Sequence, residues 1–194
     1  MVRVKMLDQE SKISADASKE IANHVADLTK RMLFNNEYEL EKPPYSEADK
    51  IIFGQKIANI LVAGAEIRII IRIHYTDAMG DEFLKKYSAA KEISYKKIDD
   101  YFMECCNMVA GRLKQSFAEN DFNVGISIPV RTKGFDDLFF AVTSNEDVTF
   151  EWHWDLFSSV GTSIHFSIFI ELLTDENVKK MVFKNDSNDE VEFF

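Results

Sequence analysis

The chain has 194 residues, a length that predicts a single domain spanning 1–194. Hydrophobic residues make up 46% and charged residues 29% of the sequence, a balance that excludes global disorder. The formal net charge is −10, and no cluster of Lys and Arg stands out. Binding to nucleic acid or to an anionic membrane draws on such clusters, so neither is an expected partner.

The sequence also predicts where the protein works. No segment approaches 18 consecutive apolar residues, so no transmembrane helix is expected. The first twelve residues lack the apolar stretch of a signal peptide. Cys105 and Cys106 are adjacent in a helical pattern, where a disulfide between them is sterically poor. A cytoplasmic protein with free thiols is the expectation.

In the first half, residues 1–12 are polar and are expected to form a loose start or an edge strand. A helix is predicted over 14–33, where apolar residues recur every three or four positions. Residues 35–50 contain two adjacent prolines and form the least regular stretch. Strands are predicted over 55–63 and 65–75, the second with isoleucine at every other position. A short capped helix over 78–89 follows.

In the second half, the longest helix is predicted over 94–119, with Phe102, Cys106, Val109, Leu113 and Phe117 on its buried side. The remaining elements are a strand that ends near a proline, three further strands and a final helix to about Phe183. The four strands are predicted over 123–131, 137–144, 147–157 and 163–173. The two halves, about 13–90 and 94–183, therefore show the same order of elements and indicate an internal repeat.

The two long helices carry the same polar pattern. Each position in the second helix lies 84 residues after its counterpart in the first; the residues are Asp16, Glu20 and Asn23, then Asp100, Glu104 and Asn107. At 100° per residue, the second set and Gly111 fall within a stripe about 60° wide, opposite the buried side. A solvated helix face is the simple interpretation. However, Asn and Gly both cost helix stability, Gly by about 1 kcal/mol, and Gly111 would let another molecule approach the helix closely.

The segment Glu104-Cys-Cys-Asn107-Met-Val-Ala-Gly111 resembles the Glu-x-x-Asn-x-x-x-Gly signature of the CheC/CheX chemotaxis phosphatases, and Pro129 follows Asn107 after 21 residues, close to the spacing of that family. Two such motifs on corresponding helices resemble CheC. The resemblance covers most of the chain and implies an α/β, pseudo-duplicated CheC/CheX-like fold. In that fold a central, mainly antiparallel sheet carries two long motif helices on its outside.

The resemblance implies hydrolysis of the aspartyl phosphate on a CheY-type response regulator, in two-component signalling. It gives Asn107 and Asn23 the role of orienting the attacking water, and it gives Glu104 and Glu20 an ion pair with a lysine of the regulator. Asp100, Gly111 and Asp16 would line the partner-binding surface. This chain would bind no metal or other cofactor, because Mg²⁺ is expected on the partner.

One departure from the pattern sets the two motifs apart. Asp27 stands in the first helix where Gly111 stands in the second, and a carboxylate there would repel an approaching phosphoryl group. The second motif is therefore predicted to be active and the first to be degenerate. The alternative function is a non-catalytic protein of the same fold that binds a response regulator, a receptor-modifying enzyme or a flagellar switch component.

Other candidate sites have weaker support. His24, His74, His153 and His165 are scattered and show no metal-binding spacing. Cys106 points toward the predicted core and no phosphate-binding loop follows it, which disfavours a cysteine phosphatase. Trp152 and Trp154 are expected to be buried rather than to bind a ligand. Glycine-rich nucleotide-binding loops are absent from the sequence.

Overall fold

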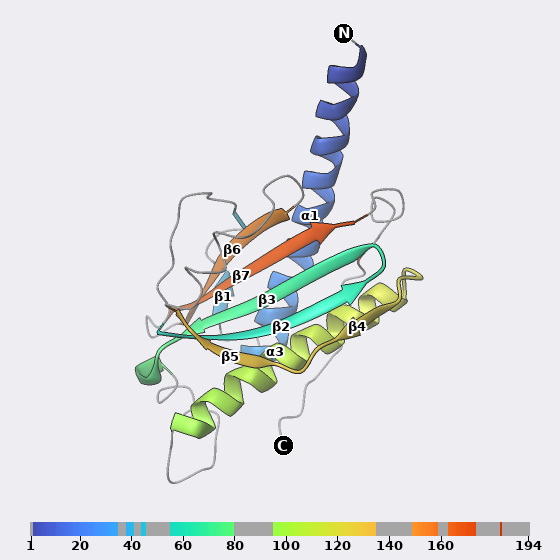
Figure 1. Cartoon of the computed structure of the whole chain (residues 1–194). Helices are drawn as coiled ribbons and strands as arrows, with labels where there is room; N and C mark the ends of the chain where they lie inside the picture. The colour runs from blue at the N-terminus through green and yellow to red at the C-terminus, as the bar shows by residue number, and fades with distance from the viewer. Residues whose placement is uncertain are drawn as a thin grey trace.

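A computed structural model of the chain describes residues 2–34, 38–40, 44–45, 55–79, 95–134, 149–158, 163–173 and 183. Two long helices, α1 (Val2–Phe34) and α3 (Tyr95–Ala118), cover one face of a seven-stranded sheet, as Figure 1 shows. The predicted class, a mainly antiparallel sheet with two long helices outside it, is confirmed. The strands are β1 (Tyr38–Leu40), β2 (Lys56–Gly64), β3 (Ile67–Tyr75), β4 (Val124–Ile126), β5 (Val130–Lys133), β6 (Thr149–Ser158) and β7 (Ser163–Leu172).

The strand order is β1-β6-β7-β3-β2-β4, with β5 also paired to β2, and all these pairs are antiparallel. The hairpins β2–β3 and β6–β7 meet through β3 and β7 at the centre of the sheet. The short strands of each half pair with the hairpin of the other half. Strand β1 of the first half pairs with β6, and strands β4 and β5 of the second half pair with β2. This arrangement is compatible with the predicted duplication, which stays a prediction.

The two faces of the sheet have different partners. On β3, the isoleucines at 67, 69, 71 and 73 are buried against the helices, while Arg68, Arg72 and His74 point to the other face. The same alternation on β7 buries Ile164, Phe166, Ile168 and Ile170. This period of two is what the sequence predicts for a strand with one face on the core. The face of the sheet opposite α1 and α3 is called the outer face below.

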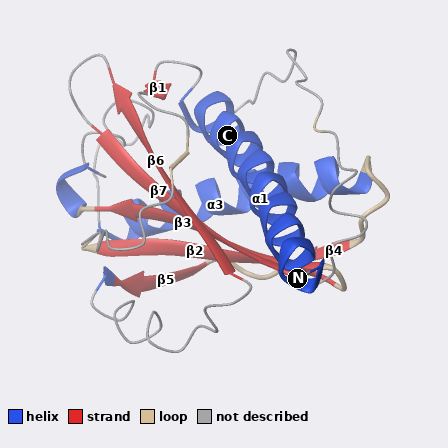
Figure 2. Ribbon diagram, turned by 90° about the horizontal axis from the view of Figure 1, so that it is seen from above, coloured by secondary structure: helices blue, strands red, loops and turns tan. Residues whose placement is uncertain are grey.

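Specific contacts join the helices to the inner face of the sheet. The indole nitrogens of Trp152 and Trp154 donate to Ser18 Oγ and Thr29 Oγ1 on α1, each at 3.1 Å. Cys106 Sγ on α3 lies 3.4 Å from the Ala58 carbonyl oxygen on β2. Seen from above in Figure 2, α1 and α3 run at an angle to each other.

The structure differs from the sequence prediction in two places. Residues 2–12 belong to α1 instead of forming a loose start or an edge strand. The reason is that this segment contains no Gly or Pro and is rich in Met, Leu, Gln, Glu and Lys, which favour helix. The single strand predicted over 123–131 is two strands, β4 and β5, because Pro129 cannot donate a hydrogen bond to the sheet.

Three predicted elements lie outside the described residues: the strand over 137–144, the final helix and most of the short helix over 78–89. The predicted strands over 55–63, 65–75, 147–157 and 163–173 and the helix over 94–119 are confirmed within two residues at each end. Among the helices that the structure describes, none has the length and apolar character needed to cross a membrane.

Candidate functional site

The motif on α3 forms a small polar surface on the side of the helix that faces away from the sheet. Asp100, Glu104, Asn107 and Gly111 are all exposed. Three residues on the opposite side, Cys106, Val109 and Leu113, are fully buried, as the helical spacing predicts. Asn107 Nδ2 donates to Glu104 Oε2 at 3.5 Å, a long contact that leaves both side chains available to a partner.

Gly111 lies one turn after Asn107 on the same exposed side. A Cβ atom added at this position would meet nothing within 4 Å. Packing inside the protein therefore does not require glycine here, although glycine costs a helix interior about 1 kcal/mol relative to alanine. The position is therefore open to a side chain, and nothing in the described structure explains the glycine.

A charged cluster fixes the start of α3, one residue before Asp100. Asp99 accepts hydrogen bonds from Lys56 Nζ at 3.0 Å and from Tyr75 Oη at 2.9 Å. Arg131 Nη1 lies 3.4 Å from its other oxygen, and Lys56 also pairs with Asp77. Burial opposes the charge on Lys56, but its hydrogen bonds to Asp77 and Asp99 raise the pKa of this lysine. The cluster thus ties α3 to β2, β3 and β5.

The sequence analysis missed this cluster, although one signal for it exists. Lys56 shares its strand face with Ala58, Ile60 and Val62, which are buried against the helices. A lysine at a position where the alternation calls for an apolar residue requires an acidic partner. Here the partners are Asp77 and Asp99, which lie 21 and 43 residues further along the chain.

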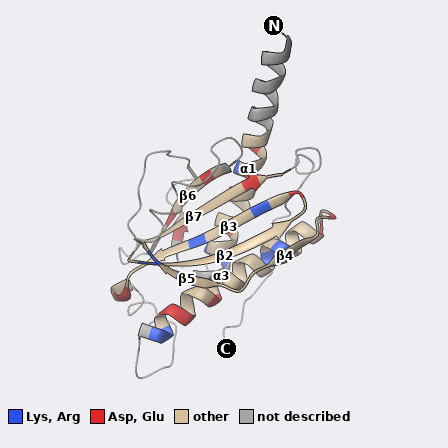
Figure 3. Ribbon diagram, in the orientation of Figure 1, with Lys and Arg blue, Asp and Glu red and all other residues tan. Residues whose placement is uncertain are grey.

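The motif on α1 is less accessible than its counterpart. Asp16, Glu20 and Asp27 are exposed, but Asn23 is half-buried. The helical pattern predicts that both Glu–Asn pairs lie opposite the core and are exposed, and this holds for Glu20, Glu104 and Asn107 but not for Asn23. The two helices share one face of the sheet, and each carries exposed acidic residues of its motif. Figure 3 shows acidic residues, in red, on the first half of α3.

His24, next to Asn23, links the two helices. Its Nε2 atom lies 2.9 Å from Ser116 Oγ on α3, and its ring stacks on that of Phe183 with centroids 4.2 Å apart. Burial, with a smaller contribution from the positive charge of Arg31, lowers the pKa of His24 to about 4. This histidine is therefore neutral in the folded protein at pH 7.

We expect His24 to make the protein less stable in acid. Between pH 6.5 and 4 an unfolded histidine takes up a proton that folded His24 does not, so stability falls as the pH drops through this range. His24→Gln removes the titration and keeps a side chain that can bond to Ser116. Between pH 7 and pH 4, urea unfolding should show a loss smaller by about 2 kcal/mol in the variant than in the natural protein. Parallel losses would show that His24 does not cause the effect.

Comparison with known proteins finds similar solved structures but no similar sequence family. No protein-family model matches the sequence, and no curated protein matches it. Among solved structures, the chemotaxis protein CheX from Vibrio vulnificus superposes with a TM-score of 0.62 at 18% identity, over 78% of this chain and 99% of that one. A CheC-like superfamily protein from Shewanella sp. PV-4 gives 0.61 at 19% identity, over 78% and 97%. This chain has the CheX/CheC fold.

A third match contains a partner. The CheX–CheY–BeF3–Mg²⁺ complex from Borrelia burgdorferi superposes with a TM-score of 0.53 at 17% identity, over 82% of this chain and 96% of that one. The matches cover nearly the whole of each solved structure. The likeness to the CheX/CheC fold, which the motif on α3 predicts, therefore holds for an entire domain.

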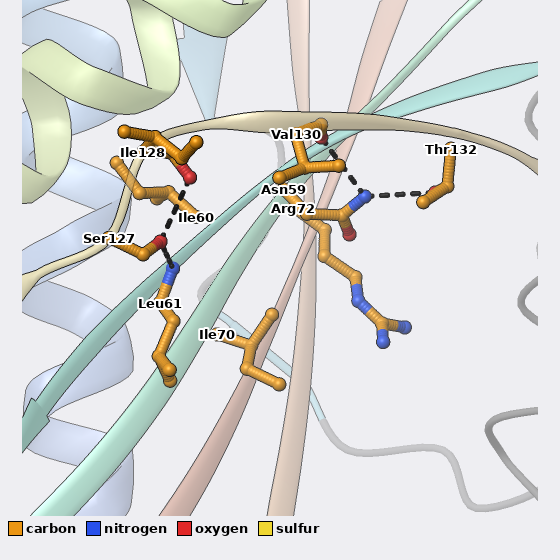
Figure 4. A pocket seen from close by; sticks show the side chains of 9 residues that line it. All are labelled: Asn59, Ile60, Leu61, Ile70, Arg72, Ser127, Ile128, Val130 and Thr132. Carbon is orange, nitrogen blue, oxygen red and sulfur yellow. Dashed lines mark hydrogen bonds between the residues drawn. The ribbon is translucent and has the colours of Figure 1, made fainter.

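A pocket of about 240 Å³ lies on the outer face (Figure 4), and none of the motif residues of α1 or α3 lines it. Its lining is mostly apolar and includes Leu61, Ile70, Ile128 and Val130, with Arg72 as its one charged residue. Asn59 Nδ2, which donates to Thr132 Oγ1 at 2.9 Å, holds β5 against β2 at its edge. The pocket lining has no carboxylate, histidine or thiol, so the hydroxyls of Ser127 and Thr132 have no base there that would activate them as nucleophiles.

Catalysis by a cysteine thiol also has no support in this protein. Cys105 and Cys106 are free and buried. Burial raises the pKa of Cys105 to about 12 and that of Cys106 well above its ordinary range, so neither forms a thiolate near neutral pH. Among the side chains that the structure describes, no three His, Cys, Asp or Glu are grouped in a way that could hold a metal ion.

Proposed function

We propose that this protein hydrolyses the aspartyl phosphate of a CheY-type response regulator in chemotaxis signalling. The observation that carries the proposal is the exposed pair of Glu104 and Asn107 beside Gly111, on the outer side of α3 in a CheX/CheC fold. The solved complex of a similarly folded CheX with CheY supports the choice of partner. The regulator acts in the cytoplasm, so this protein is proposed to lie there as well.

The proposed hydrolysis needs few catalytic groups from the phosphatase. An aspartyl phosphate is already reactive, and the regulator supplies the Mg²⁺ and the lysine that balance the phosphoryl charge. What remains is to place one water molecule in line with the phosphorus, and positioning of this kind can lower a barrier by several kcal/mol. The amide of Asn107 can both donate and accept a hydrogen bond, so it can hold that water without acting as a strong base.

Glu104 has a different role in this scheme. Its carboxylate stands one turn before Asn107 and is within reach of it. An ion pair between Glu104 and the lysine of the regulator would fix the position of the docked partner. The start of α3 is held by Asp99, Lys56 and Tyr75, so the helix presents Asp100 and Glu104 on a rigid support. The protein as a whole is acidic, and long-range attraction to an acidic regulator is not expected.

The direct test is an assay of phosphate release. CheY-type regulators from the same genome are phosphorylated, and their loss of phosphate is timed in Mg²⁺ with and without this protein. The proposal expects faster loss for at least one regulator. Unchanged lifetimes for every regulator would rule out the phosphatase activity, and binding measured in parallel would then support the alternative function.

That alternative, a non-catalytic protein that binds a regulator, a receptor-modifying enzyme or a flagellar switch component, has one observation in its favour. The motif on α1 has a half-buried Asn23 and carries Asp27 in place of a glycine. This first motif therefore fits binding better than catalysis. In the phosphatase proposal it is a second, weaker docking surface.

The role of Gly111 can be tested separately. We expect Gly111→Ala to stabilise the free protein by about 0.5–1 kcal/mol, because alanine favours helix and its Cβ meets nothing within 4 Å. The same change should slow phosphate release, because the methyl group stands where the regulator approaches. Urea unfolding and the release assay measure the two effects. A variant that is more stable and equally active would show that close approach at Gly111 is not needed.

A further inference from the structure

Tyr75 joins the end of β3 to the start of α3. It is the last residue of β3 and is 1% exposed, and its ring stacks on that of Phe102 with centroids 4.2 Å apart. Its hydroxyl donates to Asp99 Oδ1 at 2.9 Å. Burial, followed by the hydrogen bond to Asp99, raises the pKa of Tyr75 well above its ordinary range. The hydroxyl therefore keeps its proton and remains a donor at neutral pH.

Among the described side chains that contact the Asp99 carboxylate, Tyr75 is the most firmly placed. Lys56 Nζ lies 3.0 Å from Oδ1, but it ends a long flexible side chain and also pairs with Asp77. Arg131 Nη1 lies 3.4 Å from Oδ2, is 41% exposed and comes from β5, which pairs with β2. Tyr75 comes from β3, which is paired on both sides, with β2 and with β7.

Asp99 lies at the margin between the buried and the exposed sides of α3. Its side chain is 15% exposed, and it is turned by about 100° from Asp100 around the helix axis. The buried side, which includes Phe102 and Cys106, holds α3 through apolar contacts, and these are not directional. A hydrogen bond is directional, so the contact from Tyr75 at this margin limits rotation of the helix start about its axis.

Rotation of the helix start would displace the proposed docking side chains. With a helix diameter of about 10–12 Å, a turn of about 10° moves a side-chain end at the helix surface by about 1 Å. A displacement of about 1 Å can change the rate of an enzyme by about 100-fold. Asp100 and Glu104 follow the anchored residue most closely, so they move first. Asn107 stands further along the helix, where Cys106 and Val109 are fully buried.

We propose that Tyr75 is a positioning residue: through Asp99, it holds the docking part of the motif on α3 in place. That part consists of Asp100 and Glu104. The inference rests on the proposed function and adds to it a residue that belongs to neither motif helix. The first helix offers a contrast, because the residue 84 positions before Asp99 is Ala15, whose methyl group cannot accept a hydrogen bond. The anchoring carboxylate thus stands on the helix whose motif is proposed to be active.

The test uses Tyr75→Phe, which keeps the ring that stacks on Phe102 and removes the hydroxyl. The first readout, amide hydrogen exchange in the whole protein, does not depend on activity. The amides of residues 99–104 should exchange at least about 10-fold faster, the size expected for loss of a hydrogen bond to a charged group. The amides of residues 107–113 and of β7 should change by less than about 3-fold, because their packing is untouched.

The second readout is the kinetics of phosphate release. Tyr75→Phe should raise the KM for the phosphorylated regulator by about 5-fold or more and change kcat by less than about 2-fold. The reason is that the docking side chains move, whereas Asn107, which orients the water, does not. A merely structural role for Tyr75 would lower the stability of the protein but leave both constants of the folded variant unchanged.

Tyr45→Phe is the matched control. It also removes a tyrosine hydroxyl that donates to a carboxylate, in this case to Asp155 Oδ2 at 3.3 Å, but on the outer face of the sheet. Because this contact is remote from the start of α3, the variant should leave hydrogen exchange on α3, KM and kcat unchanged.

The proposal is overturned by unchanged exchange at residues 99–104, by equal acceleration throughout α3 and β7, or by local acceleration without a change in KM. An equal rise of KM in Tyr75→Phe and Tyr45→Phe would also overturn it. If the natural protein hydrolyses no regulator, the proposed function fails separately, and the affinity for a regulator bound to BeF3 and Mg²⁺ then takes the place of KM. A natural protein that does not bind this complex either would overturn the inference together with the proposed function.

Discussion

Asn107→Ala should reduce the acceleration of phosphate release by about 100-fold or more while leaving the fold unchanged. The substitution removes the amide that orients the attacking water, and losses of this size are typical when a positioning group is removed. Asn107 is exposed and its contact with Glu104 is long, at 3.5 Å. The free energy of unfolding should therefore change by no more than about 0.5 kcal/mol. Release is timed with the phosphorylated regulator in Mg²⁺, and stability is measured by urea unfolding.

Gln115→Ala provides a matched control, because it removes another exposed amide from the same helix. Gln115 accepts a hydrogen bond from Arg112 at 2.9 Å and has no place in the proposed site. This variant should keep its activity. If Asn107→Ala released phosphate as fast as the natural protein, or if both variants lost activity equally, Asn107 would not be the group that positions the water.

The core and the exposed motif on α3 could be predicted because both follow from local periodicity. The alternation of isoleucine on β3 determines which face is buried, whatever the strand pairs with. The helical spacing likewise places Cys106 and Leu113 inside and Asn107 outside. These inferences need no knowledge of strand order, and the structure confirms them.

Pro129 gives a physical reason for the break between β4 and β5, but the contact that bridges the break could not be predicted in the same way. Ser127 exchanges two hydrogen bonds with the backbone of Leu61: its backbone N–H donates to the carbonyl oxygen at 2.8 Å, and its hydroxyl accepts from the N–H at 3.0 Å. This contact joins residues 66 positions apart in the chain. Local pattern over 123–131 does not show that Ser127 bonds to Leu61, because that contact depends on the pairing with β2.

For the same reason, the sequence analysis did not predict that His74, His153 and His165 lie close together. His74, His153 and His165 are spread over 92 residues, and the sequence suggests ordinary strand positions for them. They come together only because β3 and β6 both pair with β7 in a particular register. A shift of one residue in either pairing would move a histidine to the opposite face. Contacts that depend on the register between distant strands cannot be predicted from the local sequence pattern.

The two motifs should contribute unequally to catalysis, with Asn107→Ala costing far more activity than Asn23→Ala. Both helices carry Asp, Glu and Asn at the same spacing, so the sequence motif alone does not rank them. The structure gives one reason for a ranking: Asn23 is half-buried whereas Asn107 is exposed. The sequence gives the other, because exposed Asp27 stands at the position of Gly111. Each change makes it harder for a phosphoryl group to reach the amide on α1.

The comparison needs both single variants and the double variant, assayed against one phosphorylated regulator at saturating Mg²⁺. Asn23→Ala alone should retain most of the activity, and the double variant should be no less active than Asn107→Ala within about two-fold. Equal losses from the two single variants would show that both halves work and that the glycine is unimportant. A larger loss from Asn23→Ala would reverse the ranking.

Asp27→Gly in the Asn107→Ala background then separates two causes. If Asp27 is what disables the first motif, removing it should raise the residual rate. A defect caused by its negative charge should also be relieved by salt, because charges on an exposed helix face are screened within about 10 Å at 0.1 M ionic strength. A defect caused by lost close approach should be independent of salt and respond only to Asp27→Gly. If neither salt nor Asp27→Gly restores activity, the half-buried position of Asn23 accounts for the difference, because neither treatment brings this amide out to the surface where the regulator docks.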